Sequence, residues 1–358
     1  MRQLEFGWFL PTAGDTTAYG VPESQIPSSL DMFDRVLHAA EAAGFEYMLV
    51  PVNTACWEAW ITSAMMVARS KTMRMLVAAR PSYINPVLLA KMITTFDQLS
   101  SGRISINLIA GQSEAESASD GVKWGKEARY EIMAEEVAIL KALWTTRGAT
   151  KFDGKFYQLD NAYCQPRPFQ MPHPRFYLGG GSRQALELSA QHADVHLFWG
   201  DTYARIADNM RLIRALATGH GREIGFGMRL QVVCRPTERE AWDFAHGLVE
   251  HATERQKQFI QTQYATSEAN RRVQELARTH GELIEPHLWT GITQVRPGAG
   301  IAIVGDPEQC AATLQKFIDL GCHSFCLSGY LHDTEAEIFG RCVMPILRAC
   351  NPGRMAAG

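Results

Sequence analysis

Residues 29–51, SLDMFDRVLHAAEAAGFEYMLVP, decide the fold. Their first part carries apolar residues at helical spacing, and Gly44 stands where that helix would end, because glycine commonly follows the last residue of a helix. Residues 45–51, FEYMLVP, are a short apolar run that predicts a buried strand. The stretch therefore predicts a helix followed at once by a strand, which is one step of an alternating α/β fold.

The same alternation runs along the whole chain. Strands are predicted at residues 4–10, 45–51, 73–81, 102–111, 175–181, 194–200, 224–236 and 322–330. Helices are predicted at 29–44, 57–70, 86–100 and 128–145, after 181, after 200, from about 238, at 307–321 and at 333–350. Strands that alternate with helices form a parallel sheet, and eight such units favour a closed (β/α)8 TIM barrel over an open sheet. No G-x-G-x-x-G follows the first strand, which argues against a dinucleotide-binding sheet.

Two segments interrupt the alternation. Residues 150–159, TKFDGKFYQL, predict a small hairpin that turns at Asp153-Gly154. Residues 252–300 are polar and then glycine-rich, and an insertion of this kind in a compact domain is usually a lid or a disordered segment. We therefore expect one barrel domain over residues 1–350, with a mobile lid at about 252–300 before the last strand, and a flexible tail at 351–358.

Composition excludes several classes of protein. The 358 residues are 46% hydrophobic and carry a net charge of -3, which is ordinary for a soluble globular chain and does not suggest a nucleic-acid surface. No apolar run reaches the ~18 residues of a membrane span, and the N-terminus does not read as a signal peptide. The eight cysteines are scattered without a CxxC pair, which predicts free thiols in a cytoplasmic protein, with Cys322 and Cys326 as core fillers. The histidines lack metal-ligand spacing, so no metal site is expected.

In a barrel of this kind the active site lies at the C-terminal ends of the strands. The residues found there in this sequence are Cys56, Asn107, Gly180, Gly181, Ser182, Trp199, Arg229, Gln231, Tyr330 and His332. The run LGGGS, residues 178–182, opens a helix and suits a phosphate, because glycines expose backbone N–H groups and the helix N-terminus adds positive potential. A tight turn capped by Ser182 is the structural alternative. Tyr130, near the start of another helix, could donate to the same phosphate.

Two arginines are candidates for binding an anion. Arg229 lies within a predicted strand, where it either pairs with a barrel carboxylate or presents its planar fork of donors to an anionic ligand. Arg296 lies in the flexible run VRPGAG, where it is either solvated or brought over the ligand by closure of that segment. If both arginines meet one anion, the loop around Arg296 bends because it has to close.

The chain resembles a known family at these residues. The segments that carry the resemblance are FGWFLPTAGD, CWEAW, LVAARPS, QLSSGRISINLIAG, ARYE, YLGGGS, FWGD, GMRLQVV, LWTGITQVRPGAGIAIVGD and LSGYLH. They are similar to the bacterial-luciferase-like, reduced-flavin-dependent monooxygenases, and most similar to the alkanesulfonate monooxygenases among them. The resemblance extends nearly from end to end.

The resemblance implies a TIM barrel that binds reduced FMN supplied by a separate NAD(P)H-dependent flavin reductase. With O2, such an enzyme oxygenates the carbon that bears the sulfur of a small organosulfonate and gives an aldehyde and sulfite. Family members form homodimers or homotetramers. The resemblance places sulfonate-pocket or catalytic roles on Arg229, Arg296, Trp199, Tyr330 and Cys56, and flavin contacts on Ala78, Asn107, Tyr130, Gly180, Gly181 and Ser182.

The sequence departs from the family at two positions. Ala13 and Gln231 stand where histidine is common, and glutamine cannot carry a proton as imidazole does. Either His332 or Tyr330 then handles proton transfer, or the substrate differs in shape; a purely structural hydrogen bond is the alternative for His332. Other functions that fit are an oxygenase acting on a sulfone or another small molecule, a deazaflavin-dependent oxidoreductase, and a non-enzymatic flavin-binding subunit.

Overall fold

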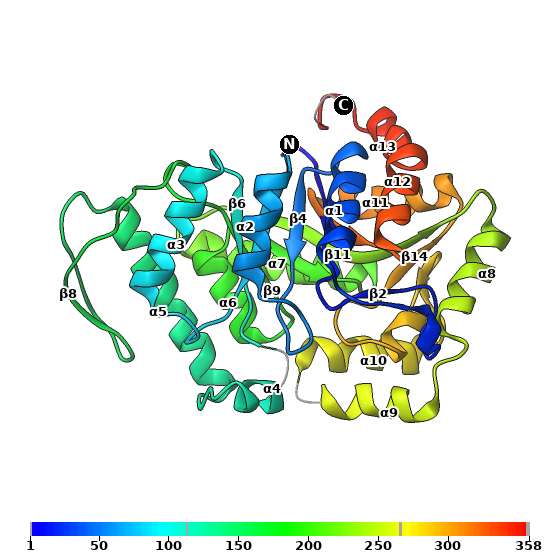
Figure 1. Ribbon diagram of the computed structural model, residues 1–358, viewed down its shortest axis with the longest axis horizontal. Coiled ribbons are helices and arrows are strands. Elements are labelled where there is room, and N and C mark those ends of the chain that lie inside the picture. Colours follow the sequence, from blue (N-terminus) through cyan, green and yellow to red (C-terminus); the bar gives the residue numbers. More distant parts are fainter. Residues whose placement is uncertain (1, 112–113, 265–266, 356–358) are drawn as a thin grey trace.

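The computed structural model describes residues 2–111, 114–264 and 267–355 (Figure 1). Within them, eight parallel strands pair in a closed ring, because β11 joins both β10 and β15, and β15 joins β1. In ring order they are β1 (Glu5–Phe9), β4 (Tyr47–Val50), β5 (Arg74–Ala79), β6 (Ile104–Leu108), β9 (Phe176–Gly179), β10 (Val195–Trp199), β11 (Gly225–Cys234) and β15 (Ser324–Ser328). All eight lie within the predicted strand ranges, and the predicted TIM barrel is confirmed.

Helices surround the ring (Figure 1). They are α1 (Leu30–Ala42), α2 (Ala59–Arg69), α3 (Pro86–Leu99), α4 (Glu114–Ser119), α5 (Lys126–Thr145), α6 (Arg183–His192), α7 (Tyr203–Gly219), α8 (Glu238–Val249), α9 (Glu254–Gln263), α10 (Glu268–His280), α11 (Pro307–Leu320), α12 (His332–Cys342) and α13 (Met344–Cys350). The last two replace the single closing helix that the sequence predicts. Pro345 lies in the first turn of α13, where its missing N–H is tolerated, and a helix could not run unbroken through it.

The helix and strand of residues 29–51 form as their sequence predicts. The Ser29 hydroxyl caps α1 by accepting a hydrogen bond from the backbone N–H of Met32. Phe33 and Leu37, on the inner face of α1, are buried against the barrel. Gly44 has a φ of 86°, a left-handed conformation that lets the chain leave the helix and enter β4.

The N-terminal end of the barrel is closed by a buried ionic cluster. Glu5 at the start of β1 accepts hydrogen bonds from Arg74 and Arg175, at 2.8 and 2.9 Å, and from the hydroxyl of Tyr177. Burial raises the pKa of Glu5, but the two guanidinium groups outweigh it and lower the pKa to about 2. These side chains fill the N-terminal end of the barrel interior.

The hairpin predicted at 150–159 is present with a wider turn. Its strands are β7 (Thr150–Asp153) and β8 (Gln158–Ala162), so the turn spans residues 154–157 and is longer than the predicted one at Asp153-Gly154. The carboxylate of Glu135 on α5 accepts the backbone N–H groups of Lys155, Phe156 and Tyr157, which holds the wider turn in place.

The segment at 252–300 is more regular than its polar composition predicts. It contains α9, α10, β12 (Leu283–Glu285), β13 (Leu288–Trp289) and the 3-10 helix η2 (Gly291–Gln294). β12 and β13 continue the sheet beyond the barrel through β14 (Ala302–Gly305), which pairs with the end of β11. Residues 265–266 of the predicted lid lie outside the described residues, and the mobility of the segment stays a prediction.

The remaining elements are β2 (Asp15–Thr16), the 3-10 helix η1 (Pro22–Ser24) and β3 (Gln25–Ile26), all in the loop after β1. The first and last described segments meet near Leu4, whose N–H donates to the carbonyl of Arg354 at 2.6 Å (Figure 1). Residues 356–358 of the predicted tail lie outside the described part of the chain. All eight cysteines are free thiols, and Cys322 and Cys326 are fully buried as expected. No helix in the described ranges is long and apolar enough to cross a membrane.

Candidate active site

A cavity of about 630 Å³ opens at the C-terminal ends of the barrel strands. Figure 1 shows α4, α9 and α10 gathered at this end of the barrel. Most of the residues that the sequence predicts for the site line this cavity, namely Cys56, Asn107, Tyr130, Gly180, Gly181, Ser182, Trp199, Arg229, Arg296, Tyr330 and His332. The structure thus brings together residues that are up to 276 positions apart in the sequence.

Two predicted site residues do not line the cavity. Gln231 is fully buried, where its side-chain amide donates to the carbonyl of Ala299 at 3.0 Å and accepts from the hydroxyl of Ser328 at 2.6 Å. Residues 299–301 lead into β14 alongside β11, and Gln231 bonds to them through both its side chain and its backbone N–H, so its role in this structure is to hold that segment. Ala78, in β5, is buried in the barrel wall beside Asn107 of β6 and also lies away from the cavity surface.

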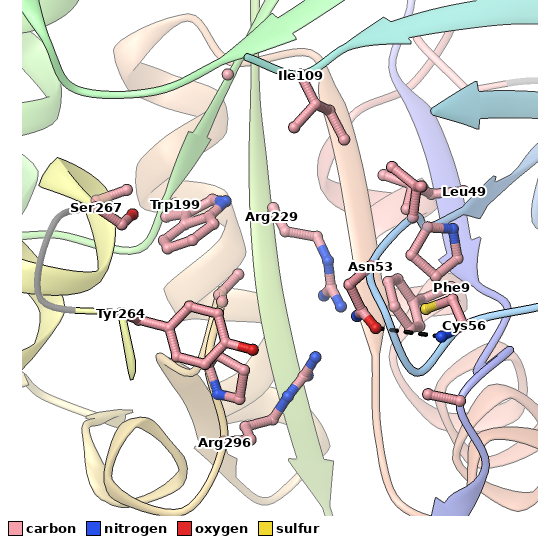
Figure 2. Close-up of a pocket in the computed structure, with 18 of the residues that line it drawn as sticks. Phe9, Leu49, Asn53, Cys56, Ile109, Trp199, Arg229, Tyr264, Ser267 and Arg296 are labelled. Carbon is pink, nitrogen blue, oxygen red and sulfur yellow. Dashed lines mark hydrogen bonds between the residues drawn. The ribbon is translucent and has the colours of Figure 1, made fainter. Parts of the chain in front are cut away.

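Arg229 and Arg296 point into the same space (Figure 2). Their guanidinium carbons lie 4.6 and 5.9 Å from the centre of the Phe9 ring, so both cations share one aromatic neighbour. Arg229 is 5% exposed and donates to the carbonyl of Leu230 at 2.8 Å. Among the described residues, neither arginine has a carboxylate within salt-bridge distance. The alternative that Arg229 pairs with a barrel carboxylate is therefore not what the described part of the chain shows.

A pair of tyrosines adjoins Arg296. The hydroxyl of Tyr19 donates to the hydroxyl oxygen of Tyr330 at 2.7 Å, and the two rings meet edge to face. Burial lowers the pKa of Arg296, but the neighbouring oxygens of Tyr330 and Tyr19 outweigh it, so that the pKa is raised. Burial also raises the pKa of Tyr19 well above its ordinary value. At neutral pH this corner of the cavity holds a charged guanidinium beside the neutral phenol of Tyr19.

His332 lies beside Tyr330 at the end of β15. Its ring is 5.3 Å from that of Tyr330 and 5.8 Å from that of Phe9. The Asp15 carboxylate oxygen Oδ2 accepts the backbone N–H of His332 at 2.8 Å and lies 2.9 Å from its Nδ1. The backbone carbonyl of His332 accepts the indole N–H of Trp8 at 2.9 Å, so the residue is held from two sides.

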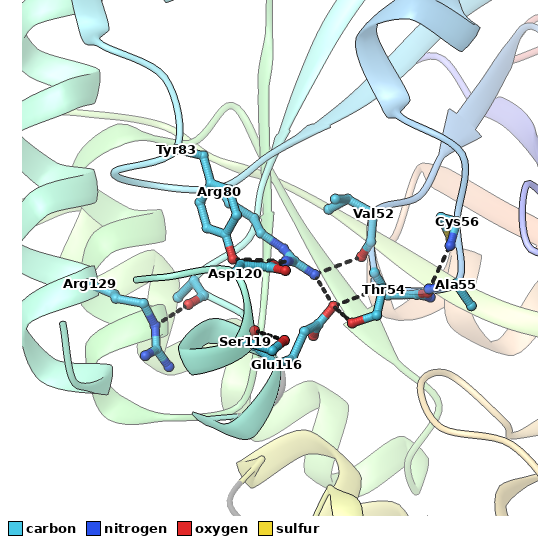
Figure 3. A network of polar contacts seen from close by, with 12 residues as sticks. Val52, Thr54, Ala55, Cys56, Arg80, Tyr83, Glu116, Ser119, Asp120 and Arg129 are labelled. Carbon is cyan, nitrogen blue, oxygen red and sulfur yellow. Dashed lines mark hydrogen bonds and ion pairs between the residues drawn. The ribbon is translucent and has the colours of Figure 1, made fainter. Parts of the chain in front are cut away.

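The loop that carries Cys56 is fixed by a polar network (Figure 3). The backbone N–H of Cys56 donates to Asn53, at 3.1 Å to its carbonyl and 3.2 Å to its side-chain oxygen. Glu116 on α4 accepts the N–H of Thr54 at 2.9 Å and the guanidinium of Arg80 at 2.5 Å. Because Arg80 and Glu116 are both buried, this ion pair ties the loop after β4 to the end of β5 and to α4. Burial raises the pKa of Cys56, which leaves a neutral thiol facing the cavity at neutral pH.

The cavity wall at the end of β9 is suited to an anionic group. Ser182 caps α6 by accepting the N–H of Ala185 at 3.3 Å, and its hydroxyl donates to the oxygen of Tyr130 at 3.3 Å. Gly180 has a φ of 128°, which a residue with a side chain rarely adopts, and a Cβ on Gly181 would meet only open space. The first N–H groups of a helix have no partner within it, so the start of α6 offers donors and positive potential to a phosphate. These residues therefore fit the phosphate end of a flavin mononucleotide.

The model of the luciferase-like monooxygenases matches residues 4–324. The chain belongs to this family. The fold of this luciferase-like monooxygenase is also similar to solved structures of proteins that have different activities. One is a riboflavin lyase with modified FMN and riboflavin, which is 19% identical over 100% of this chain and 93% of that one, with a TM-score of 0.81. Another is an EDTA monooxygenase from Chelativorans sp. BNC1, which is 17% identical over 100% of this chain and 96% of that one, with a TM-score of 0.75. A third is an F420-dependent secondary alcohol dehydrogenase in complex with an F420-acetone adduct, which is 16% identical over 97% of this chain and 100% of that one, with a TM-score of 0.67. At these identities the likeness shows the fold and leaves the substrate open.

The site of this luciferase-like monooxygenase also contains residues that sequence reasoning missed. Phe9, Asp15 and Tyr19 line the cavity from the end of β1 and the loop after it, and Tyr264 lines it from the end of α9 (Figure 2 shows Phe9 and Tyr264). FLPTAGD follows the first strand, and that position could have indicated Asp15, but no local signal identifies its partner His332 more than 300 residues away. Within the described ranges, no group of three or more histidine, cysteine or acidic side chains could hold a metal ion.

Proposed function

We propose that this luciferase-like monooxygenase is the oxygenase component of a two-component system that acts on a small organosulfonate. It would use reduced FMN and O2 to oxygenate the carbon bearing the sulfonate group, and release an aldehyde and sulfite. The single observation that carries the proposal is the pair Arg229 and Arg296, which face one cavity without a carboxylate partner among the described residues.

A buried Arg229 and a half-buried Arg296, with no carboxylate at salt-bridge distance among the described residues, favour an anionic ligand. Taking a charge out of water costs several kcal/mol per ion, and a ligand oxyanion that binds between the arginines would offset that cost. A sulfonate offers three oxygens to two planar guanidinium forks, which suits charge-assisted hydrogen bonds. The sequence resemblance to alkanesulfonate monooxygenases supports a sulfonate over other oxyanions.

The flavin phosphate is assigned to the cavity wall between the end of β9 and the start of α6. Gly180, Gly181 and Ser182 would hold its phosphate at the start of α6, with Tyr130 as a further donor. When bound, reduced FMN would supply the electrons that activate O2. No dinucleotide-binding motif follows the first strand, which favours delivery of the reduced flavin by a separate NAD(P)H-dependent flavin reductase.

The protein's own groups would then do three things. Arg229 and Arg296 bind the sulfonate and orient the carbon next to it. Trp199 and Phe9 line the same cavity with aromatic surface, which limits water there. Tyr330 and His332 are the groups placed to give or take a proton near the anion, since Cys56 is a neutral thiol and Gln231 lies outside the cavity.

A coupled assay tests the proposal. The protein is incubated with FMN, a generic NADH-dependent flavin reductase, O2 and a panel of sulfonates, with dimethyl sulfone and simple carboxylates alongside, and sulfite and aldehyde are measured. Sulfite released with an aldehyde in equal amount, for one class of sulfonate and only in air, supports it. Oxidation of the sulfone alone would reassign the substrate, and turnover only with a reduced deazaflavin in the absence of air would replace oxygenation by hydride transfer.

A further inference from the structure

We propose that Asp15 is a positioning residue that keeps Nδ1 of His332 toward its carboxylate and so presents Nε2 to the cavity as a proton acceptor. The inference rests on the proposed function, because it assigns a step of that reaction. Its structural part, the orientation and protonation of the His332 ring, can be tested without any substrate.

The loop after β1 holds the side chains at the end of β15. Asp15 Oδ2 contacts both the backbone N–H and the Nδ1 of His332, at 2.8 and 2.9 Å, and Oδ1 accepts the backbone N–H of Thr16 at 2.9 Å. The backbone contact is a hydrogen bond, whereas the ring contact lies within ion-pair distance without meeting hydrogen-bond geometry. Asp15 is 6% exposed and His332 is 2% exposed, so water does not compete for these contacts.

The other ring nitrogen of His332 is left for a ligand. His332 lines the cavity, and no described residue makes a hydrogen bond with its Nε2. A buried ring nitrogen without a partner is costly, which points to a ligand or substrate group as its partner. A carboxylate beside Nδ1 favours the tautomer with the proton on Nδ1, and this leaves a lone pair on Nε2. Although burial raises the pKa of Asp15, its contacts with His332 and the backbone N–H of Thr16 outweigh burial and lower the pKa, which favours the ionised carboxylate.

The neighbouring Tyr330 is placed to act as a proton donor. Its oxygen already accepts the hydroxyl proton of Tyr19 at 2.7 Å, so its own proton is free to be donated elsewhere. The rings of Tyr330 and His332 meet edge to face at 5.3 Å. Two residues of one loop, Asp15 and Tyr19, thus set a donor and an acceptor side by side at the end of β15.

The reaction needs an acceptor of this kind after oxygen has been inserted. The product of that insertion is a 1-hydroxyalkylsulfonate, in which the carbon bears both a hydroxyl and the sulfonate. Nε2 of His332 takes the hydroxyl proton, the O–H electron pair forms the C=O bond, and the C–S bond breaks with its electrons leaving on sulfur as sulfite. The balance closes as aldehyde, sulfite and one proton on the imidazole, with no further oxidant.

The first test measures the tautomer directly. The protein is labelled with ¹⁵N at Nδ1 of histidine in one sample and at Nε2 in another, and magic-angle-spinning spectra at pH 8 are compared with those of His332→Gln. The signal lost in the variant should be that of a protonated Nδ1 in the first sample and of an unprotonated Nε2 in the second. A proton on Nε2 would overturn the proposal, whether or not the protein releases sulfite from any sulfonate.

The second test is a double-mutant cycle on sulfite release. Asp15→Asn should lower kcat by roughly 10- to 100-fold, a typical share of general acid–base catalysis, with the KM for the sulfonate changed less than about threefold. In the His332→Gln background the same change should cost nothing further, because the ring it positions is gone. Losses that multiply would show that Asp15 acts independently of His332 and would contradict the inference.

A matched control comes from the next residue. Asp333→Asn makes the same substitution one position beyond His332, where the carboxylate pairs with the exposed Arg35 at 3.3 Å outside the cavity. It should leave kcat unchanged. If Asp15→Asn does not fold, the tautomer of the unaltered protein still decides the question.

Discussion

Replacement of Arg229 by methionine should make the ligand-free protein more stable while it disables the site. In the folded state Arg229 makes one charge-assisted hydrogen bond to the Leu230 carbonyl, worth about 1.5–3 kcal/mol, and a contact with Phe9 worth about 0.5–2 kcal/mol. Against these stands the burial of an unpaired cation next to Arg296, which costs several kcal/mol. Burial also lowers the pKa of Arg229, in agreement with a guanidinium that is poorly compensated.

The balance favours methionine, which fills similar space without a charge. We expect Arg229→Met to raise the free energy of unfolding by about 1–2 kcal/mol, which corresponds to a rise in Tm of roughly 2–4 °C for a large domain. The same variant should bind the sulfonate more weakly by about 2–4 kcal/mol, or about 30- to 1,000-fold in KM. Stability gained together with loss of function is what a site residue shows and a structural arginine does not.

The assay is thermal unfolding at pH 8 with and without sulfonate and FMN, alongside steady-state sulfite release. Arg235→Met is the matched control, since Arg235 is half-buried but pairs with the buried Glu335 at 2.6 Å. Burial raises the pKa of Glu335 to about 7 even with Arg235 beside it. At pH 8 the removal of Arg235 therefore leaves a buried, ionised Glu335 without its partner and should lower Tm. If Arg229→Met were destabilised as much as Arg235→Met and kept its KM, the anion-site argument would be wrong.

Four further predictions follow from the site and its surroundings. Arg296→Ala should leave FMN affinity nearly intact but lower the sulfite formed per NADH oxidised, with hydrogen peroxide making up the difference; an unchanged yield would remove its role in closing the site. Gly181→Ala should keep its Tm, because the added methyl meets open space, yet weaken FMN binding about tenfold in a fluorescence titration if the phosphate lies there. Because burial raises the pKa of Cys56, iodoacetamide at pH 7.5 should alkylate it more slowly than the exposed Cys350, as followed by mass spectrometry. Burial raises the pKa of Glu136 from 4.5 to about 7, so the folded state, which is favoured below pH 4.5 by the protonated side chain, loses that stability as the pH rises through 7. Glu136→Gln should therefore raise the free energy of unfolding by up to about 3 kcal/mol at pH 8 and by much less at pH 5.

The barrel could be predicted because its signals are local. A buried parallel strand is a short apolar run, and a helix end such as Gly44 marks where the next strand starts. The helices of the 252–300 segment could have been found by the same means. Thr253 and Gln256 form a capping box at the start of α9, and this spacing is readable in the sequence.

The rest depended on contacts between distant parts of the chain. The turn after β7 is widened by Glu135, which lies on another element and has no local signature. Gln231 lies in the predicted strand, yet its side chain bonds to the segment at Ala299, which enters β14 from a distant part of the sequence, and does not line the cavity. Asp15 could be placed at a strand end, but its contact with His332 exists only once the ring of strands has closed.

The most direct test of the proposed activity is a single turnover without a reductase. The protein is loaded with photoreduced FMN and a sulfonate from the reactive class, mixed with oxygenated buffer, and the sulfite formed per reduced flavin is counted. The proposal predicts close to one sulfite per flavin in the wild type, little in Arg229→Met, and none when O2 is left out. Stoichiometric hydrogen peroxide with no sulfite from any sulfonate, or sulfite released equally without O2, would contradict it.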